Sequence, residues 1–311
     1  MGIYNTAVNR LLERKTVFAD LINGGLYDGL QVIRPEDLEP VSDNSGILYQ
    51  NEKGEKKALE RRGDIRMRAN KKTYSVIFAE ETQQNVHYGM VVRNMLYDTL
   101  EYTKQLQDRE KLHKEQGEKL SGNEFLSGIT KEDRFSPVVN IVLFFGDTWD
   151  GAESLHDLIH WGSEEEKAFW KPFVPDYHLN LIHACSVEEP KKFRSCLQQI
   201  FSVLKYRQDK KNMRRYLLEH QDELDRMDRV EQEAMTTLLG MREQLFPMIE
   251  EENIMMCQAF QELFEDARME GRTEGHNAGR TEGHTEKLIE LICKKLRKGK
   301  SPEMIAEDLE E

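Results

Sequence analysis

Two acidic residues and a glutamine occupy positions that neighbouring strands would bring together. Asp64 lies near the start of GDIRMRANKKTYSVIFAEETQ, residues 63–83, and Glu81 and Gln83 close the same stretch. Side chains alternate along a strand, so Glu81 and Gln83 project from one face at the end of the second strand of this stretch. If the two strands pair antiparallel through the RANKK turn, Asp64 comes opposite the Glu81 region. Two carboxylates and an amide would then converge.

This group of side chains favours metal chemistry. Two ionised carboxylates in one site repel each other, and a hard divalent cation with oxygen ligands relieves that repulsion. We therefore expect Mg²⁺ or Mn²⁺ between Asp64 and Glu81. Such an ion can generate the nucleophile for phosphodiester hydrolysis.

The segment around the predicted site is basic. Residues 53–72 contain nine Lys or Arg residues against three acids, a net charge of +6, whereas the whole chain has a net charge of −13. A local positive charge of this kind suits the phosphate backbone of DNA, although a charged hairpin can also be a solvated sheet edge. The expected DNA-binding residues are Arg61, Arg62, Arg66, Arg68, Lys71 and Lys72.

Hydrophobic periodicity predicts the elements that would position these residues. The order is one helix, three strands in a meander, a helix packed on the sheet, a central strand and one further strand. This order indicates an α/β fold. The expected ranges are 5–23, 46–50, 59–68, 73–80, 86–106, 137–145 and 176–184.

The C-terminal part of the chain is expected to be mostly helical. Residues 186–264 form a charged helical subdomain, and the tail at 265–311 carries glycine at 271, 275, 279 and 283. Glycines four apart give either a helix with a bare stripe that another helix approaches, or a flexible charged linker. Beyond the stripe we expect a helix, a stop at Gly299, and a short helix capped by Ser301 with Pro302 at its first position.

Composition and motifs indicate the cellular compartment and argue against two classes of enzyme. The four cysteines have no CxxC spacing, and no apolar run approaches the eighteen or so residues of a membrane helix. We expect a reduced, cytoplasmic protein without a membrane partner. Neither a P-loop nor a GxSxG elbow is present, so nucleotide hydrolysis and serine hydrolysis lack support.

An acidic residue followed on the next strand by Glu-x-Gln, within this order of elements, resembles the PD-(D/E)XK nuclease superfamily. Longer segments resemble more closely the Rpn family of recombination-promoting nucleases and transposase-like proteins, over nearly the whole chain. The resemblance implies a PD-(D/E)XK core with an α-β-β-β-α-β mixed sheet over residues 1–185. The segments that carry it include FADLINGGLYDGLQVIRPEDLEPV, HYGMVVRNMLYDTLEY, SPVVNIVLFFGDTWDGAESLHDLI and the EGRTEGH tail.

The resemblance also implies roles for individual residues. Asp64 and Glu81 would ligate the metal, and Gln83 would stand where the superfamily has a lysine. An amide orients water but carries no charge, so Arg93 on the following helix is the candidate for the missing cation. Asp20, from the first helix, would complete the metal site.

The implied function is a Mg²⁺-dependent DNA endonuclease in recombination or mobile-element biology, acting as a homodimer or higher homo-oligomer. Glu80 departs from the family pattern, which has an apolar residue there, and this leaves open a shifted strand register or a degenerate site. The alternative function is therefore a catalytically inactive DNA-binding or assembly protein of the same descent. A purely structural scaffold is a third possibility.

Overall fold

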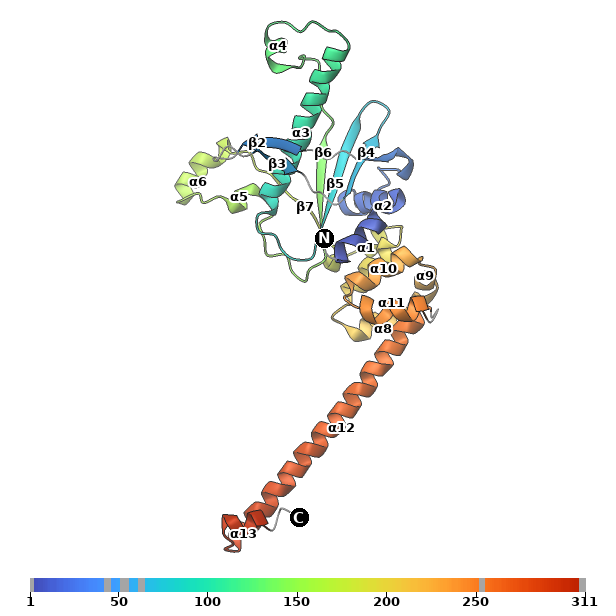
Figure 1. Ribbon diagram of the computed structural model, residues 1–311, viewed down its shortest axis with the longest axis vertical. Coiled ribbons are helices and arrows are strands. Elements are labelled where there is room, and N and C mark those ends of the chain that lie inside the picture. The colour runs from blue at the N-terminus through green and yellow to red at the C-terminus, as the bar shows by residue number, and fades with distance from the viewer. Residues whose placement is uncertain (1–2, 42–45, 51–55, 61–64, 252–254, 308–311) are drawn as a thin grey trace. The chain divides into compact units, whose positions relative to one another are not determined.

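The computed structural model describes residues 3–41, 46–50, 56–60, 65–251 and 255–307 of the 311-residue chain. The chain divides into two compact units, Met1–Phe246 and Pro247–Glu311. The first unit contains all the described strands, and the second contains the long C-terminal helix (Figure 1).

A five-stranded mixed sheet forms the centre of the first unit (Figure 1). Its order is β1-β4-β5-β6-β7; β4 pairs antiparallel with β1 and β5, whereas β6 pairs in parallel with β5 and β7. The expected α/β class is thereby confirmed, and the apolar run at 137–145 is an interior strand. The strands span Leu38–Pro40 (β1), Ile65–Asn70 (β4), Ser75–Gln83 (β5), Val138–Phe144 (β6) and Asn180–His183 (β7).

The strands between residues 46 and 70 belong to two sheets, and the expected three-stranded meander is therefore wrong. Gly46–Gln50 (β2) and Lys56–Glu60 (β3) form an antiparallel pair of their own. The strand predicted at 59–68 overlaps two strands of different sheets, β3 up to Glu60 and β4 from Ile65, and β4 buries alternate residues. Periodicity also missed β1, a three-residue strand whose Pro40 suits the edge of the sheet, where no N–H is needed for pairing.

The first predicted helix is two helices, Ile3–Leu12 (α1) and Lys15–Leu26 (α2). Arg14, with an extended ψ of 119°, separates them. Gly24 was expected to end the helix, but it lies inside α2. A Cβ at Gly24 would come within 2.4 Å of the Phe193 ring, so this glycine allows close packing and does not terminate the helix.

A long helix, Met90–Glu115 (α3), packs along β6 (Figure 1). It starts after Gly89, later than expected, and runs further toward the C-terminus. Three short helices lie in the connections before and after β6. They are Asn123–Ser127 (α4), Leu155–Leu158 (α5) and Glu164–Trp170 (α6).

The expected helical region follows β7, and its first helices pack on the core. Helix α1 contacts α10, and Arg14 forms two hydrogen bonds with Asp228, from Nη1 to Oδ2 at 2.6 Å and from Nη2 to Oδ1 at 3.0 Å. Asp228 is also the N-cap of α10, where it accepts from Val230 and Glu231. The helices are Leu197–Lys205 (α7), Lys210–Glu219 (α8), Gln221–Asp225 (α9), Arg229–Leu238 (α10) and Arg242–Glu251 (α11).

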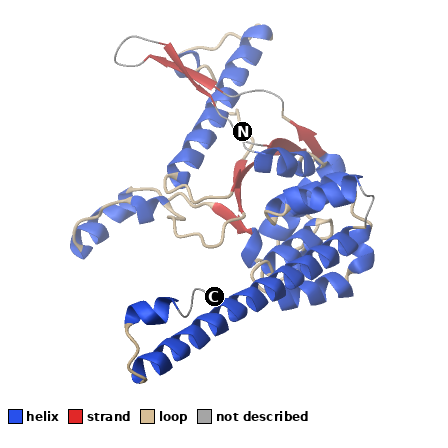
Figure 2. Cartoon of the chain, turned by 60° about the horizontal axis from the view of Figure 1, so that its bottom comes forward, coloured by secondary structure: helices blue, strands red, loops and turns tan. Residues whose placement is uncertain are grey.

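The tail is helical, and the flexible-linker interpretation is wrong. A single helix of 42 residues, Met256–Arg297 (α12), contains the glycine stripe, and Pro302–Glu307 (α13) follows it (Figure 2). Gly299 has a φ of +79°, and Ser301 Oγ accepts a hydrogen bond from Met304 N at 3.4 Å, as the predicted stop and cap require. A Cβ at Gly279 would meet nothing within 4 Å in this chain.

Candidate active site

The last residues of β5 carry the side chains that were expected to do chemistry. Glu81 pairs with Val142 and Gln83 with Phe144 across the parallel ladder to β6, so Glu81 and Gln83 share one face of the sheet. On the other side of β5, Ile65 is the partner of Glu80. The antiparallel pairing through RANKK is thus confirmed. Asp64 lies outside the described residues, and its approach to Glu81 stays a prediction.

Helix α3 brings a cation to Glu81. Arg93 Nη2 lies 2.5 Å from Glu81 Oε1, and Gln83 Nε2 donates to the same oxygen at 3.2 Å. Arg93 Nε also donates to Tyr97 Oη at 2.7 Å, which orients the guanidinium. Glu81 is only 5% exposed, whereas the Arg93 side chain is 32% exposed. The end of β5 therefore holds a buried carboxylate, an amide and a partly accessible cation in mutual contact.

Glu80 faces the opposite side of the sheet from Glu81, because side chains alternate along β5. It is buried, and Thr82 Oγ1 donates to its Oε1 at 3.0 Å. The open question about the strand register is thereby answered for β5, since Glu81 and Gln83 face α3 together and Glu80 does not join them.

A second polar layer lies between α3 and the sheet, and sequence reasoning missed it. Arg66 Nη2 bonds to Glu101 Oε2 with both side chains buried. Asp98 accepts hydrogen bonds from Asn140 Nδ2 and, at 2.7 Å, from Tyr177 Oη. The signal that the sequence offers is the spacing of Asp98 and Glu101, which are three apart and therefore lie on one side of α3.

The structure gives Asp20 a different environment from the one expected of a metal ligand. Its Oδ1 accepts from Arg194 N at 2.9 Å, and its Oδ2 accepts from Ser195 N at 2.8 Å and Ser195 Oγ at 2.6 Å. The carboxylate is buried and caps the turn before α7. A metal ion would have to compete with these donors, so Asp20 is not among the metal ligands of the proposed active site.

The expected DNA-binding residues are in different surroundings. Arg68 and Lys72 are exposed, whereas Lys71 Nζ contacts Asp37 Oδ2 at 2.9 Å. The prediction for Arg66 is wrong. Its guanidinium forms a buried ion pair with Glu101 beneath α3 and is not accessible to DNA. Arg61 and Arg62 lie outside the described residues.

The segments after β5 and β6 meet beside this site. Tyr88 Oη donates to Asp150 Oδ2 at 3.2 Å, and this hydrogen bond raises the pKa of Tyr88. His183, at the end of β7, has its Nε2 2.9 Å from the Gly146 carbonyl oxygen. These contacts join the carboxyl ends of the three parallel strands into one rim.

The metal expected at this site can be tested against the donor atoms. Glu81 and Gln83 offer oxygen atoms, which suit a hard cation such as Mg²⁺. Within the described ranges, no group of three or more His, Cys, Asp or Glu side chains could hold a metal ion. Glu81 and Gln83 by themselves do not make up a metal site, and the second carboxylate expected there, that of Asp64, lies outside the described residues.

Comparison with known proteins finds no matching family model, no matching curated protein and no matching solved structure. The resemblance to the Rpn family and to the PD-(D/E)XK superfamily thus stays a prediction. No helix in the described part of the chain is long and apolar enough to cross a membrane.

Proposed function

We propose that the protein is a metal-dependent DNA endonuclease with its active site at the end of β5. The observation that supports this best is the contact of Glu81 with both Gln83 and Arg93. These residues come from two elements, β5 and α3; Glu81 and Gln83 were expected to share a face, and Arg93 was the candidate for the cation that the superfamily lysine would supply. The mixed sheet flanked by helices is compatible with a PD-(D/E)XK core.

Each residue would have a separate task. Asp64 and Glu81 would hold a divalent cation, which supplies an activated water and compensates the charge on the phosphate. Gln83 would orient the water by hydrogen bonds, because an amide both donates and accepts. Arg93 would bind the phosphate through the exposed part of its guanidinium while it remains beside Glu81.

DNA would approach over exposed cations of β4 and of the turn between β4 and β5, which lie toward the opposite end of β5 from Glu81. Arg68 and Lys72 are accessible for phosphate contacts, and Arg61 and Arg62 would add to them. Arg66 and Lys71 are left out because each already has an acidic partner.

A second candidate function is an inactive DNA-binding or assembly protein. The ion pair between Arg93 and Glu81 favours it, because a guanidinium on Glu81 competes with a cation for the same oxygen. The two functions differ in one property that can be measured, namely cleavage that requires a divalent cation.

We also propose that the active form is a homodimer held together by α12. Cutting both strands of DNA requires two catalytic centres in opposite orientation, and a two-fold dimer supplies them. The glycine stripe gives α12 a face on which a second helix can approach closely.

The test is cleavage of supercoiled plasmid by the purified protein with Mg²⁺ and with a chelator. We expect nicked and linear products only with Mg²⁺, and none from Glu81→Gln, which preserves shape but removes the charge. Glu39→Gln is the matched control, because Glu39 is an exposed glutamate on β1. Full cleavage by Glu81→Gln, or no cleavage by the wild type, would reject the proposed enzyme.

A further inference from the structure

A cavity of about 430 Å³ lies between helices α7 and α8 and the segment before α7. It shares no residue with the proposed active site. Its volume is in the range of about 300–1,000 Å³ that is typical of small-ligand sites. Tyr206, Tyr216 and His220 form its aromatic walls, with Ser202 also in the lining.

The aromatic rings lie against one another at an angle, with interplanar angles of 53° for Tyr216 and His220 and 43° for Tyr206 and Tyr216. The Tyr216 and His220 rings have centroids 4.2 Å apart, and the Tyr206 ring lies 6.0 Å from that of Tyr216. Tyr216 is half-buried, and burial raises the pKa of its hydroxyl, which is hydrogen-bonded to Ser202. Rings held in this way at a cavity wall offer faces on which a flat aromatic group can stack.

The surroundings of the cavity are the second basic region of the chain. Residues 188–220 contain nine Lys or Arg residues against four acids, a net charge of +5 in a chain of net charge −13. Lys191 and Lys205 are both in the cavity lining. Lys205 Nζ donates to the Glu188 carbonyl oxygen at 2.9 Å, which fixes the ammonium at the mouth.

Two cations of α8 lie in a row that leads to the cavity. Arg215 precedes Glu219, a lining residue, by four positions, and Lys211 precedes Arg215 by four, so the three side chains form one row on the helix surface. Arg215 and Lys191 are exposed and, among the described residues, neither forms an ion pair. The acids Glu188, Glu189 and Glu219 are also in the lining, where they can accept hydrogen bonds from N–H groups of a base, such as N3–H of thymine.

We propose that this cavity binds one base of a single-stranded nucleic acid whose phosphates lie on Lys191, Lys205 and the Lys211–Arg215 row. Aromatic stacking beside a positively charged track is the general means of binding single strands. A duplex would not fit, because its bases are stacked and must leave the helix to enter a pocket. A free mononucleotide would use the cavity but not the cations that continue along α8. The inference extends the DNA binding of the proposed function and requires neither metal nor cleavage.

The first experiment measures fluorescence anisotropy of a short labelled oligothymidine in chelator, with the full-length protein. Chelator prevents cleavage, so a failed nuclease assay and a failed binding assay are separate results. Loss of one base stack weakens binding by roughly 5- to 150-fold. We expect that loss for Tyr216→Leu and near wild-type binding for Tyr216→Phe, which keeps the ring; circular dichroism melting checks that both variants are folded.

The second experiment tests the phosphate track. The double variant Lys191→Gln/Arg215→Gln should flatten the dependence of log K on log salt by about 0.7 for each phosphate that the variant no longer neutralises. Its matched control is Lys119→Gln/Lys287→Gln, which removes the same charge at exposed positions elsewhere. An equal change in the control would overturn the proposal, since the binding would then be a general charge effect.

An abasic oligonucleotide separates the base from the phosphates. We expect it to bind the wild-type protein about as weakly as oligothymidine binds Tyr216→Leu. Equal affinity of the wild-type protein for both oligonucleotides would overturn the proposal. So would a mononucleotide that binds as tightly as oligothymidine, because the cavity would then be a small-molecule site without a strand track.

Discussion

Arg66 and Glu81 both lie beneath α3, and each forms an ion pair with a side chain of that helix. Alternation along β5 is enough to put Glu81 and Gln83 on one face, and this prediction is confirmed. The partner of Arg66 was not predictable, because it depends on how α3 lies across the sheet. Local charge suggested a DNA-binding arginine, whereas packing made Arg66 half of a buried ion pair with Glu101.

Arg66 and Arg68, two positions apart on β4, give a matched test of that difference. Breaking a buried ion pair leaves an uncompensated charge and costs about 3–5 kcal/mol. We therefore expect Arg66→Gln to lower the free energy of unfolding by that amount in urea titration. Arg68→Gln, at an exposed position, should change it by no more than about 0.5 kcal/mol. Equal effects would show that the Arg66–Glu101 pair contributes nothing.

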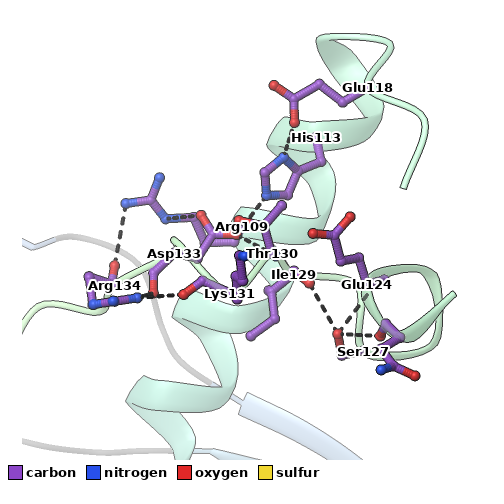
Figure 3. Close-up of polar contacts among 11 residues, drawn as sticks. Arg109, His113, Glu118, Glu124, Ser127, Ile129, Thr130, Lys131, Asp133 and Arg134 are labelled. Atoms are coloured by element: carbon purple, nitrogen blue, oxygen red, sulfur yellow. Dashed lines mark hydrogen bonds and ion pairs between the residues drawn. The ribbon is translucent and has the colours of Figure 1, made fainter. Parts of the chain in front are cut away.

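At the scale of elements, the C-terminal end of α3 is closed by a histidine between two acids (Figure 3). His113 is buried; its Nδ1 lies 2.5 Å from Glu118 Oε2, and its Nε2 lies 2.8 Å from Asp133 Oδ2. Asp133 also accepts from Thr130 N at 2.8 Å. Through these two contacts, His113 holds the segment between α4 and β6 against the end of α3. We call this group of three residues the His113 cluster.

The contribution of the His113 cluster to stability should depend on pH. The hydrogen bonds to Asp133 and Glu118 raise the pKa of His113 above 6.5, and the bond from His113 lowers the pKa of Asp133 to about 2. A raised histidine pKa stabilises the fold below about pH 6.5, and that contribution is lost as pH rises through the folded-state pKa. The contribution of Asp133 is present above about pH 4 and is lost as pH falls toward 2.

We expect amide hydrogen exchange in residues 116–136 to become faster as pH rises above 6.5, after correction for the intrinsic rate. The variant His113→Gln cannot become charged and should lose this dependence. His178→Gln is the control, because His178 is largely exposed outside this cluster. The same pH dependence of exchange in the wild-type protein and in His113→Gln would contradict the assigned role of the His113 cluster.

Element boundaries were the least predictable part of the fold. The helix at the N-terminus was expected to end at Gly24, yet α2 continues to Leu26. Gly24 has another role, because its missing side chain leaves room for the ring of Phe193, which is distant in the sequence. The strand predicted at 59–68 was also wrong because of long-range contacts. Its first residues pair with β2 and its last residues pair with β5, and periodicity does not reveal these partners. Long, strongly patterned elements such as α3 and β6 were predictable in kind.

At the scale of the whole molecule, the tail is the feature whose conformation the sequence left open. A helix with glycine at every fourth position loses about 0.5–1 kcal/mol per glycine. The structure nevertheless has one helix from Met256 to Arg297, and in the described part of the chain Gly279 and Gly283 have no neighbour at their bare face. In the proposed homodimer, a second copy of α12 would cover that face.

Truncation after Phe264 tests the role of the tail and keeps Phe260, which is buried. We expect the truncated protein to be a monomer by light scattering and to nick plasmid without frequent double-strand breaks. Gly279→Leu should also weaken association, since the side chain would fill the contact face. A truncated chain that remains dimeric would show that the interface lies within residues 1–264.

Binding of Mn²⁺, measured by isothermal titration calorimetry without DNA, tests whether a divalent cation binds at the end of β5. We expect the wild-type protein to bind Mn²⁺ and Asp64→Asn and Glu81→Gln each to abolish binding, because each removes one of two carboxylates from the cation. Arg93→Gln should bind Mn²⁺ more tightly, since the competing guanidinium is gone from Glu81. A wild-type protein that binds no Mn²⁺, or a Glu81→Gln variant that binds it unchanged, would contradict the assignment of the metal to the end of β5.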